Sequence, residues 1–291
     1  MADYIFTPGQ TKAILIVNLI STLLSVIGEV FMIYVYFKIP SMKKFSVKLI
    51  VSLMVGNFIY GLANLCTYFQ LLHDSCNLEG VLRTIGYMSA IFWALTILII
   101  SYYQLKQFNP RIEEIYNSLL LACIVISIIP GTFVITSEII HGPARFGSSL
   151  SFCAIEPLEY ALIFTSFPVW IGIIASFVYT GKFILLIRER YETRNIMEYK
   201  QIFLYAMILA LTWIPDMINR LCYWFVGRPY FSIMIMHIFF TRIAGFLNAL
   251  VFGKSVHCAI KSYYERKSMG RTVRKELSME APNLSIVFEL I

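Results

Sequence analysis

Four ionisable side chains, those of Glu29, Asp216, Arg220 and Arg242, lie inside stretches of sequence that are otherwise apolar. Charged groups are unfavourable in the hydrocarbon of a bilayer, so they face a protein interior or a water-filled cavity. Asp216 precedes Arg220 by four residues, an order and spacing that favour an ion pair on one face of a helix. One possible arrangement pairs Asp216 with Arg220 and Glu29 with Arg242. In this arrangement the charged residues serve only to hold the helices together.

A second arrangement uses the same residues to bind a ligand. Arg83, Arg220 and Arg242 would leave an excess of positive charge near the outer end of the bundle, with Asp216 orienting them. Guanidinium groups match phosphate and carboxylate oxygens in geometry, which favours a small anionic ligand. The two arrangements are compatible, because a ligand that displaces an ion pair also acts as a switch. The predicted ligand-binding set is Arg83, Tyr87, Trp213, Asp216, Asn219, Arg220 and Arg242.

Pro215 lies two residues after Trp213, inside the same predicted helix. Proline removes a backbone hydrogen bond and kinks a helix. Trp213 is three residues before Asp216 and shares its helical stripe. We therefore expect a hinge at Pro215, next to the ligand-binding set.

Seven long apolar segments must position these residues. A helix needs about 20 apolar residues to cross a bilayer. The chain is 58% hydrophobic and 14% charged, roughly half the charged fraction of a soluble protein. The fold class predicted is an all-α membrane protein, a seven-transmembrane-helix bundle, with helices at 12–37, 47–72, 78–105, 115–138, 158–187, 200–225 and 230–254.

Lys and Arg gather in alternate loops, which predicts the orientation of the bundle. Basic loops remain in the cytosol, and an odd number of crossings separates the termini. The N-terminus is therefore expected outside, the C-terminus in the cytosol, and the protein in the plasma membrane. Topology and the anionic inner leaflet account for the net charge of +7 without a nucleic-acid partner. The predicted divisions are an extracellular N-terminus at 1–11, the bundle at 12–254, an amphipathic interfacial helix at 255–266 and a disordered cytosolic tail at 267–291.

The stretch 255–266 also has a simpler interpretation, a frayed extension of the last membrane helix. The longest loop, 139–157, contains Gly142 and Pro143 and is expected to be irregular. Cys153 in that loop and Cys76 at the start of the third helix both face the oxidising side, where disulfides persist. A bridge between them would tie the loop over the mouth of the bundle.

Signatures of enzymes are missing from the sequence. There is no nucleophile elbow, phosphate-binding loop or zinc-binding HExxH motif. No spacing of His, Cys and carboxylate residues suggests a metal site. We therefore expect no enzymatic activity, no cofactor and no bound metal.

Five short blocks of sequence resemble the cyclic-AMP-receptor-like family of G-protein-coupled receptors, which includes the slime-mould chemoattractant receptors and their plant, fungal and animal relatives. The blocks are CNLEG at 76–80, IFWA at 91–94, SFCAI at 151–155, WIPDMINR at 213–220 and GFLNALVFG at 245–253. The resemblance implies a seven-helix receptor that activates a heterotrimeric G protein at its inner face. The residues expected to face the G protein are Lys106, Arg188, Arg190, Arg194 and Lys200.

The chain departs from the rhodopsin-like receptors at two positions. The third helix ends SYYQLK at 101–106, without an acidic-Arg-aromatic triplet, and Asn248 is followed by Ala249 instead of proline. The activation switches of those receptors therefore cannot be assumed.

Two other functions are considered. A transporter or channel could use the intramembrane charges as a relay, but the sequence has no repeated halves of the kind that transporters often show. A retinal-binding pump or sensor would need a Schiff-base lysine in the seventh helix, where the charged residue is Arg242.

Overall fold

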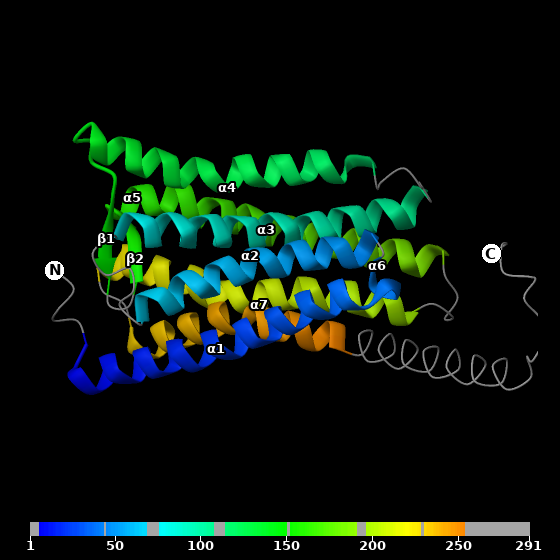
Figure 1. The fold of residues 1–291 in the computed structure, drawn as a ribbon, viewed down its shortest axis with the longest axis horizontal. Coiled ribbons are helices and arrows are strands. Elements are labelled where there is room, and N and C mark those ends of the chain that lie inside the picture. Colours follow the sequence, from blue (N-terminus) through cyan, green and yellow to red (C-terminus); the bar gives the residue numbers. More distant parts are fainter. Residues whose placement is uncertain are drawn as a thin grey trace, which may run out of the picture.

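The computed structural model of the chain describes residues 6–43, 45–68, 76–107, 114–149, 152–190, 196–227 and 230–253. Figure 1 shows a bundle of long helices that run side by side, with one two-stranded sheet at one end. The main helices are α1 (Pro8–Lys38), α2 (Phe45–Tyr68), α3 (Cys76–Gln107), α4 (Tyr116–Ile139), α5 (Leu158–Ala161), α6 (Phe167–Arg190) and α7 (Ile196–Val226). A 3-10 turn, η1 (Pro40–Met42), follows α1, and a π-helical turn, η3 (Leu162–Ser166), joins α5 to α6. A further helix spans Phe231–Gly253 and is called the 231–253 helix.

Six helices in the described part of the chain are long and apolar enough to cross a membrane. They are Pro8–Lys38, Val47–Cys66, Cys76–Tyr103, Tyr116–Ile139, Glu159–Leu186 and Phe231–Gly253. This composition suggests a multi-pass membrane protein and confirms the predicted all-α bundle in outline. Helix α7, which carries Asp216 and Arg220, is 31 residues long and runs alongside the six (Figure 1).

The outward surface of the bundle is apolar. Helix α4 is among the most apolar helices, yet only 28% of its most apolar stretch is buried. Large contiguous apolar surfaces are rare on soluble monomers, so this face suits contact with lipid. Its exposed side chains include those of Leu121, Ile124, Val125, Ile129 and Phe133.

Helix α1 begins four residues earlier than the sequence predicts. Thr7 and Gln10 form a capping box, in which Gln10 Oε1 accepts from the Thr7 N–H at 2.9 Å and Thr7 Oγ1 accepts from the Gln10 N–H at 3.4 Å. Pro8 occupies the first helical position, where its missing N–H costs nothing. The expected N-terminal segment 1–11 therefore includes the first turn of a helix.

The expectation of an irregular loop at 139–157 is wrong for its second half. Strands β1 (Arg145–Ser149) and β2 (Phe152–Glu156) pair in antiparallel register, with Phe146 opposite Ile155. Phe146 and Ile155 both pack into a buried cluster with Val134 of α4. Burial of this cross-strand pair favours a hairpin, which lies across the end of the bundle (Figure 1).

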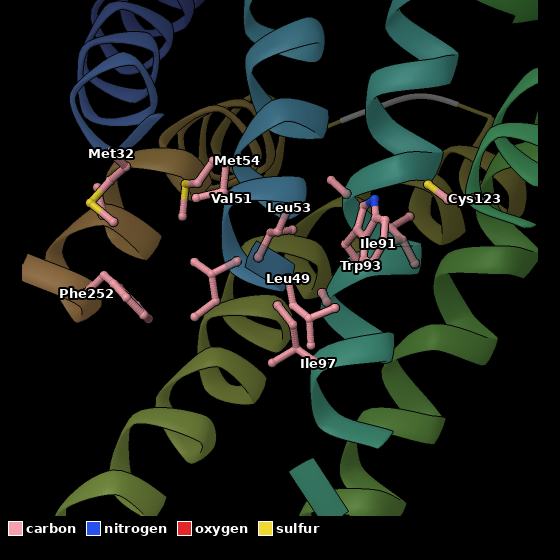
Figure 2. Close-up of a cluster of buried hydrophobic side chains, with 14 of the residues drawn as sticks. Met32, Leu49, Val51, Leu53, Met54, Ile91, Trp93, Ile97, Cys123 and Phe252 are labelled. Atoms are coloured by element: carbon pink, nitrogen blue, oxygen red, sulfur yellow. The ribbon is translucent and has the colours of Figure 1, made fainter. Parts of the chain in front are cut away.

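The largest apolar core is built mainly from α2 and α3, with further side chains from α1, α4, α6, α7 and the 231–253 helix. Figure 2 shows Leu49 and Leu53 of α2 beside Ile97 of α3 in the layer between those helices. Glycines bring the two backbones close, because a Cβ on Gly86 would overlap the backbone of Tyr60. Small residues allow such close approach between membrane helices, and here the approach places Tyr60 beside Tyr87.

Candidate functional site

A cavity of about 60 Å³ lies beneath the hairpin. Five of the seven predicted ligand-binding residues line it, all except Asn219 and Arg242. Residues outside the predicted ligand-binding set complete the lining. The whole lining consists of Tyr60, Arg83, Thr84, Tyr87, Phe146, Cys153, Ile155, Ala161, Thr165, Trp213, Asp216, Arg220 and His237.

The predicted ion pair between Asp216 and Arg220 is confirmed. Arg220 Nε donates to both carboxylate oxygens of Asp216, at 3.0 and 3.1 Å. Asp216 is buried and Arg220 is 24% exposed toward the cavity. His237 of the 231–253 helix approaches the same carboxylate, with Nδ1 2.8 Å from Oδ1. Asp216 therefore connects α7 to the 231–253 helix. No signal in the sequence indicates this contact of His237.

Thr165 connects the ion pair to the π-helical turn η3. Its hydroxyl accepts from Nη1 of Arg220 at 2.9 Å, and its carbonyl accepts from the Tyr87 hydroxyl at 3.2 Å. A π-helical turn has i to i+5 hydrogen bonds and is frequent at functional sites. The turn lets one residue offer both its carbonyl and its hydroxyl to neighbouring helices. The sequence holds no clear signal for this turn, which lies just before Pro168.

Aromatic rings form one wall of the cavity. The ring centroids of Tyr87 and Trp213 are 4.6 Å apart in an edge contact, and those of Tyr60 and Tyr87 are 6.2 Å apart. Arg242 lies 4.6 Å from the Tyr60 ring, and Arg83 lies 5.8 Å from it. Cations near a ring face are attracted to its quadrupole. Two positively charged side chains therefore lie near the Tyr60 ring in this wall.

Arg242 and Asn219 are not part of the cavity lining. Arg242 is buried, and its Nε donates to Asn18 Oδ1 of α1 at 3.0 Å. Asn219 Nδ2 lies 3.5 Å from the sulfur of Met234. The charge of Arg242 thus lies behind Tyr60, and Asn219 faces the 231–253 helix.

The other predicted ion pair, between Glu29 and Arg242, is wrong. Glu29 Oε1 accepts from the Ser25 hydroxyl at 2.8 Å, whereas Arg242 contacts Asn18 and Tyr60. The difference arises because Glu29 and Asn18 lie eleven residues apart on α1. At about 1.5 Å per residue, this separation places the two contacts at different depths in the bundle.

The hairpin is fixed to α3 by three contacts at Cys153. The sulfurs of Cys76 and Cys153 are 2.02 Å apart in a disulfide, as predicted. Glu79 accepts from the Cys153 N–H at 2.8 Å, and Arg83 Nη1 lies 3.5 Å from its carbonyl oxygen. Phe146 then packs directly on Gly80, where a Cβ would overlap its ring. The hairpin therefore forms the roof of the cavity.

A second cavity of about 20 Å³ lies on the other side of Trp213. Its polar lining comes from Asn57, Thr212 and Asn248. Trp213 lines both cavities and so forms a wall between them. Pro215 is buried in α7 between Trp213 and Asp216. The predicted hinge therefore lies next to both cavities.

Several predicted features fall at the edge of the described residues or beyond them. Lys106 lies in α3, Arg188 and Arg190 in α6, and Lys200 in α7. Arg194 and the segments predicted as an amphipathic helix (255–266) and a tail (267–291) lie outside the described residues.

Within the described residues there is no group of three or more His, Cys, Asp or Glu side chains that could hold a metal ion. No family model matches the chain, and no curated protein sequence matches it. The resemblance to the cyclic-AMP-receptor-like receptors therefore remains a prediction based on the five sequence blocks.

Proposed function

We propose that this chain is a G-protein-coupled receptor, related to the cyclic-AMP-receptor-like family, that transmits the binding of an extracellular ligand to a heterotrimeric G protein. The observation that carries the proposal is the position of Arg220. This cationic side chain reaches the cavity from α7, five residues from Pro215. A ligand that binds the guanidinium would act directly on the helix that contains the hinge.

The proposed topology counts α7 as a seventh crossing, with the hairpin end outside. The hairpin lies at the end of the bundle where α1 begins (Figure 1). A disulfide at that end suits an oxidising compartment. The opposite end holds the ends of α3 and α6 and the start of α7 (Figure 1), the regions that carry the basic residues expected to face the G protein. Such a topology fits the plasma membrane.

The charges around the cavity favour a small anionic ligand. Arg83 and Arg220 line the cavity, whereas Asp216 is the only carboxylate in the lining that the structure describes. Arg242 adds a further positive charge behind Tyr60. Pockets that bind drug-sized ligands measure roughly 300–1,000 Å³, so a cavity of about 60 Å³ admits only a group of a few atoms. A larger ligand would have to displace the hairpin or move α7.

The proposed switch is competition for Arg220. An anion that binds Nη1 would replace the hydroxyl of Thr165, and one that binds Nε would weaken the pair with Asp216. Either exchange loosens the attachment of α7 to η3 or to His237. A ligand shifts an equilibrium only by its differential affinity for the two states, and these contacts supply such a difference.

The direct test is nucleotide exchange on purified G proteins. The full chain would be reconstituted in lipid nanodiscs and screened with nucleotides, organic acids, peptides and lipids. We expect at least one G protein to exchange nucleotide, either with a ligand or constitutively. Failure with every G protein and ligand would contradict the proposal. Ion or solute flux in proteoliposomes would instead support the transporter or channel function.

A further inference from the structure

Glu29 occupies a buried notch outside the ligand cavity. Its side chain is 0% exposed, on α1, whose composition suits a membrane crossing. The notch is made by Gly245, because a Cβ there would overlap Glu29 Oε1. Gly61 of α2 lies beside the other oxygen, since a Cβ on Gly61 would lie 3.7 Å from Oε2. The carboxyl group therefore lies where α1 meets α2 and the 231–253 helix.

The two oxygens of this carboxyl group differ in their contacts. Oε1 accepts from the Ser25 hydroxyl at 2.8 Å, and the Ser25 oxygen in turn accepts from the Gly245 N–H at 3.0 Å. Oε2 is buried without a hydrogen-bond partner. The ion pairs found among the described residues involve Asp216 and Glu156, and none involves Glu29.

The ionisable neighbours of Glu29 have other partners. On the 231–253 helix, Arg242 lies three residues from Gly245, toward the hairpin, and its Nε donates to Asn18. On α2, Tyr60 precedes Gly61, and its ring faces Arg242 and Arg83. Neither helix supplies a cation to the carboxyl group in this packing.

A buried carboxylate with one hydrogen bond and no cation is strongly unfavourable, because its hydration is lost without compensation. The neutral acid avoids this penalty, and its hydroxyl makes Oε2 a hydrogen-bond donor beside α2. We propose that Glu29 is a proton-binding site that holds its proton while α1, α2 and the 231–253 helix are packed together. Loss of the proton would require water or a cation to enter the notch, so it would be coupled to separation of α1 from the 231–253 helix.

The test is carboxyl spectroscopy on the full chain in lipid nanodiscs at neutral pH. With ¹³C-labelled glutamate, infrared or solid-state NMR spectra distinguish a protonated side-chain carboxyl from an ionised one. We expect the wild-type protein to show a neutral-acid signal that disappears in Glu29→Gln. The control is Glu79→Gln, since Glu79 is also buried but accepts a backbone N–H, and that variant should keep the signal.

Two outcomes would overturn the proposal: only ionised carboxylates in the wild-type spectrum, or a neutral-acid signal that survives in Glu29→Gln. If Glu29→Gln fails to fold, the wild-type spectrum still decides between the two protonation states. Glu79→Gln then shows whether the signal comes from Glu79, the other buried glutamate in the described part of the chain. Ser25→Ala offers a further check. It should retain the neutral-acid signal but move it, because the hydrogen bond to Oε1 is lost. The result is independent of whether the chain activates a G protein.

Discussion

Arg220 of α7 donates from Nη1 to the hydroxyl of Thr165, 2.9 Å away in the π-helical turn η3. The Thr165 carbonyl accepts from Tyr87 of α3 at 3.2 Å. A single residue of η3 therefore connects α3 to α7 at the wall of the cavity. The cavity depends on this turn as much as on the charges themselves.

Replacing Thr165 with valine should destabilise the bundle. The variant Thr165→Val preserves the branched shape but removes the acceptor for Arg220. Hydrogen bonds to charged groups contribute about 1.5–3 kcal/mol, so we expect a loss of about that size, measured by thermal unfolding in nanodiscs. The control is Thr132→Val on α4, where an exposed hydroxyl bonds only to its own helix. Equal effects of the two variants would contradict the role given to Thr165.

A double-mutant cycle should reveal coupling between Asp216 and Arg220. Asp216→Asn leaves a cation without its partner, and breaking a buried pair costs about 3–5 kcal/mol. We expect a smaller loss, because Arg220 is 24% exposed and solvent screens its charge. The double variant Asp216→Asn with Arg220→Gln should recover part of the lost stability, again by thermal unfolding. Strictly additive effects would show that the pair is not coupled.

The long helices could be predicted from the sequence because each follows from local apolar composition. Apolar composition does not indicate the start of α1, because the capping box of Thr7 and Gln10 begins the helix within a polar segment. The sequence predicts an irregular loop in place of the hairpin at 145–156, because the strand pairing depends on burial of Phe146 and Ile155 against α4. That contact joins distant segments and leaves no local pattern.

Among the hydrogen bonds and ion pairs of the candidate site, the one that the sequence predicts joins two residues of the same helix. Asp216 and Arg220 follow from their spacing of four residues. The contacts of Thr165 and His237 depend on a π-helical turn and on the rotation of neighbouring helices, which composition does not reveal. Arg242 contacts Asn18 and not Glu29, because the two residues lie at different depths along α1.

Replacing Gly80 with alanine should lift the hairpin from the cavity. A Cβ at Gly80 would overlap the ring of Phe146, so the ring must move. An engineered cysteine, Thr84→Cys, would report the change, and we expect faster reaction with a polar thiol reagent in the Gly80→Ala background. The reaction must be compared with Gly131→Ala, whose Cβ would meet Val81 at an ordinary 3.4 Å. Unchanged reactivity in Gly80→Ala would show that the roof does not depend on this contact.

Reversing the charge at Arg220 should abolish the response to an anionic agonist. This prediction depends on the proposed receptor function. In Arg220→Glu the new carboxylate would repel both the ligand and Asp216, while the protein should still reach the cell surface. The matched control is Arg145→Glu in the hairpin, because Arg145 is 68% exposed and lies 3.9 Å from Glu156. Measurement of G-protein activation with surface expression separates signalling from folding, and a normal response in Arg220→Glu would exclude Arg220 as the anion-binding residue.

The glycine that makes room for Glu29 should resist substitution. A Cβ on Gly245 would overlap Glu29 Oε1, and forced overpacking costs about 1–3 kcal/mol. We expect Gly245→Ala to lower thermal stability and the double variant Gly245→Ala with Glu29→Ala to recover part of the loss, since the shorter side chain vacates the notch. Gly181→Ala on α6 is the control, because its Cβ would meet nothing within 4 Å and alanine gains about 0.8–1 kcal/mol over glycine within a helix. If Gly245→Ala were as stable as Gly181→Ala, the carboxyl group would not be confined against the 231–253 helix by the missing Cβ of Gly245.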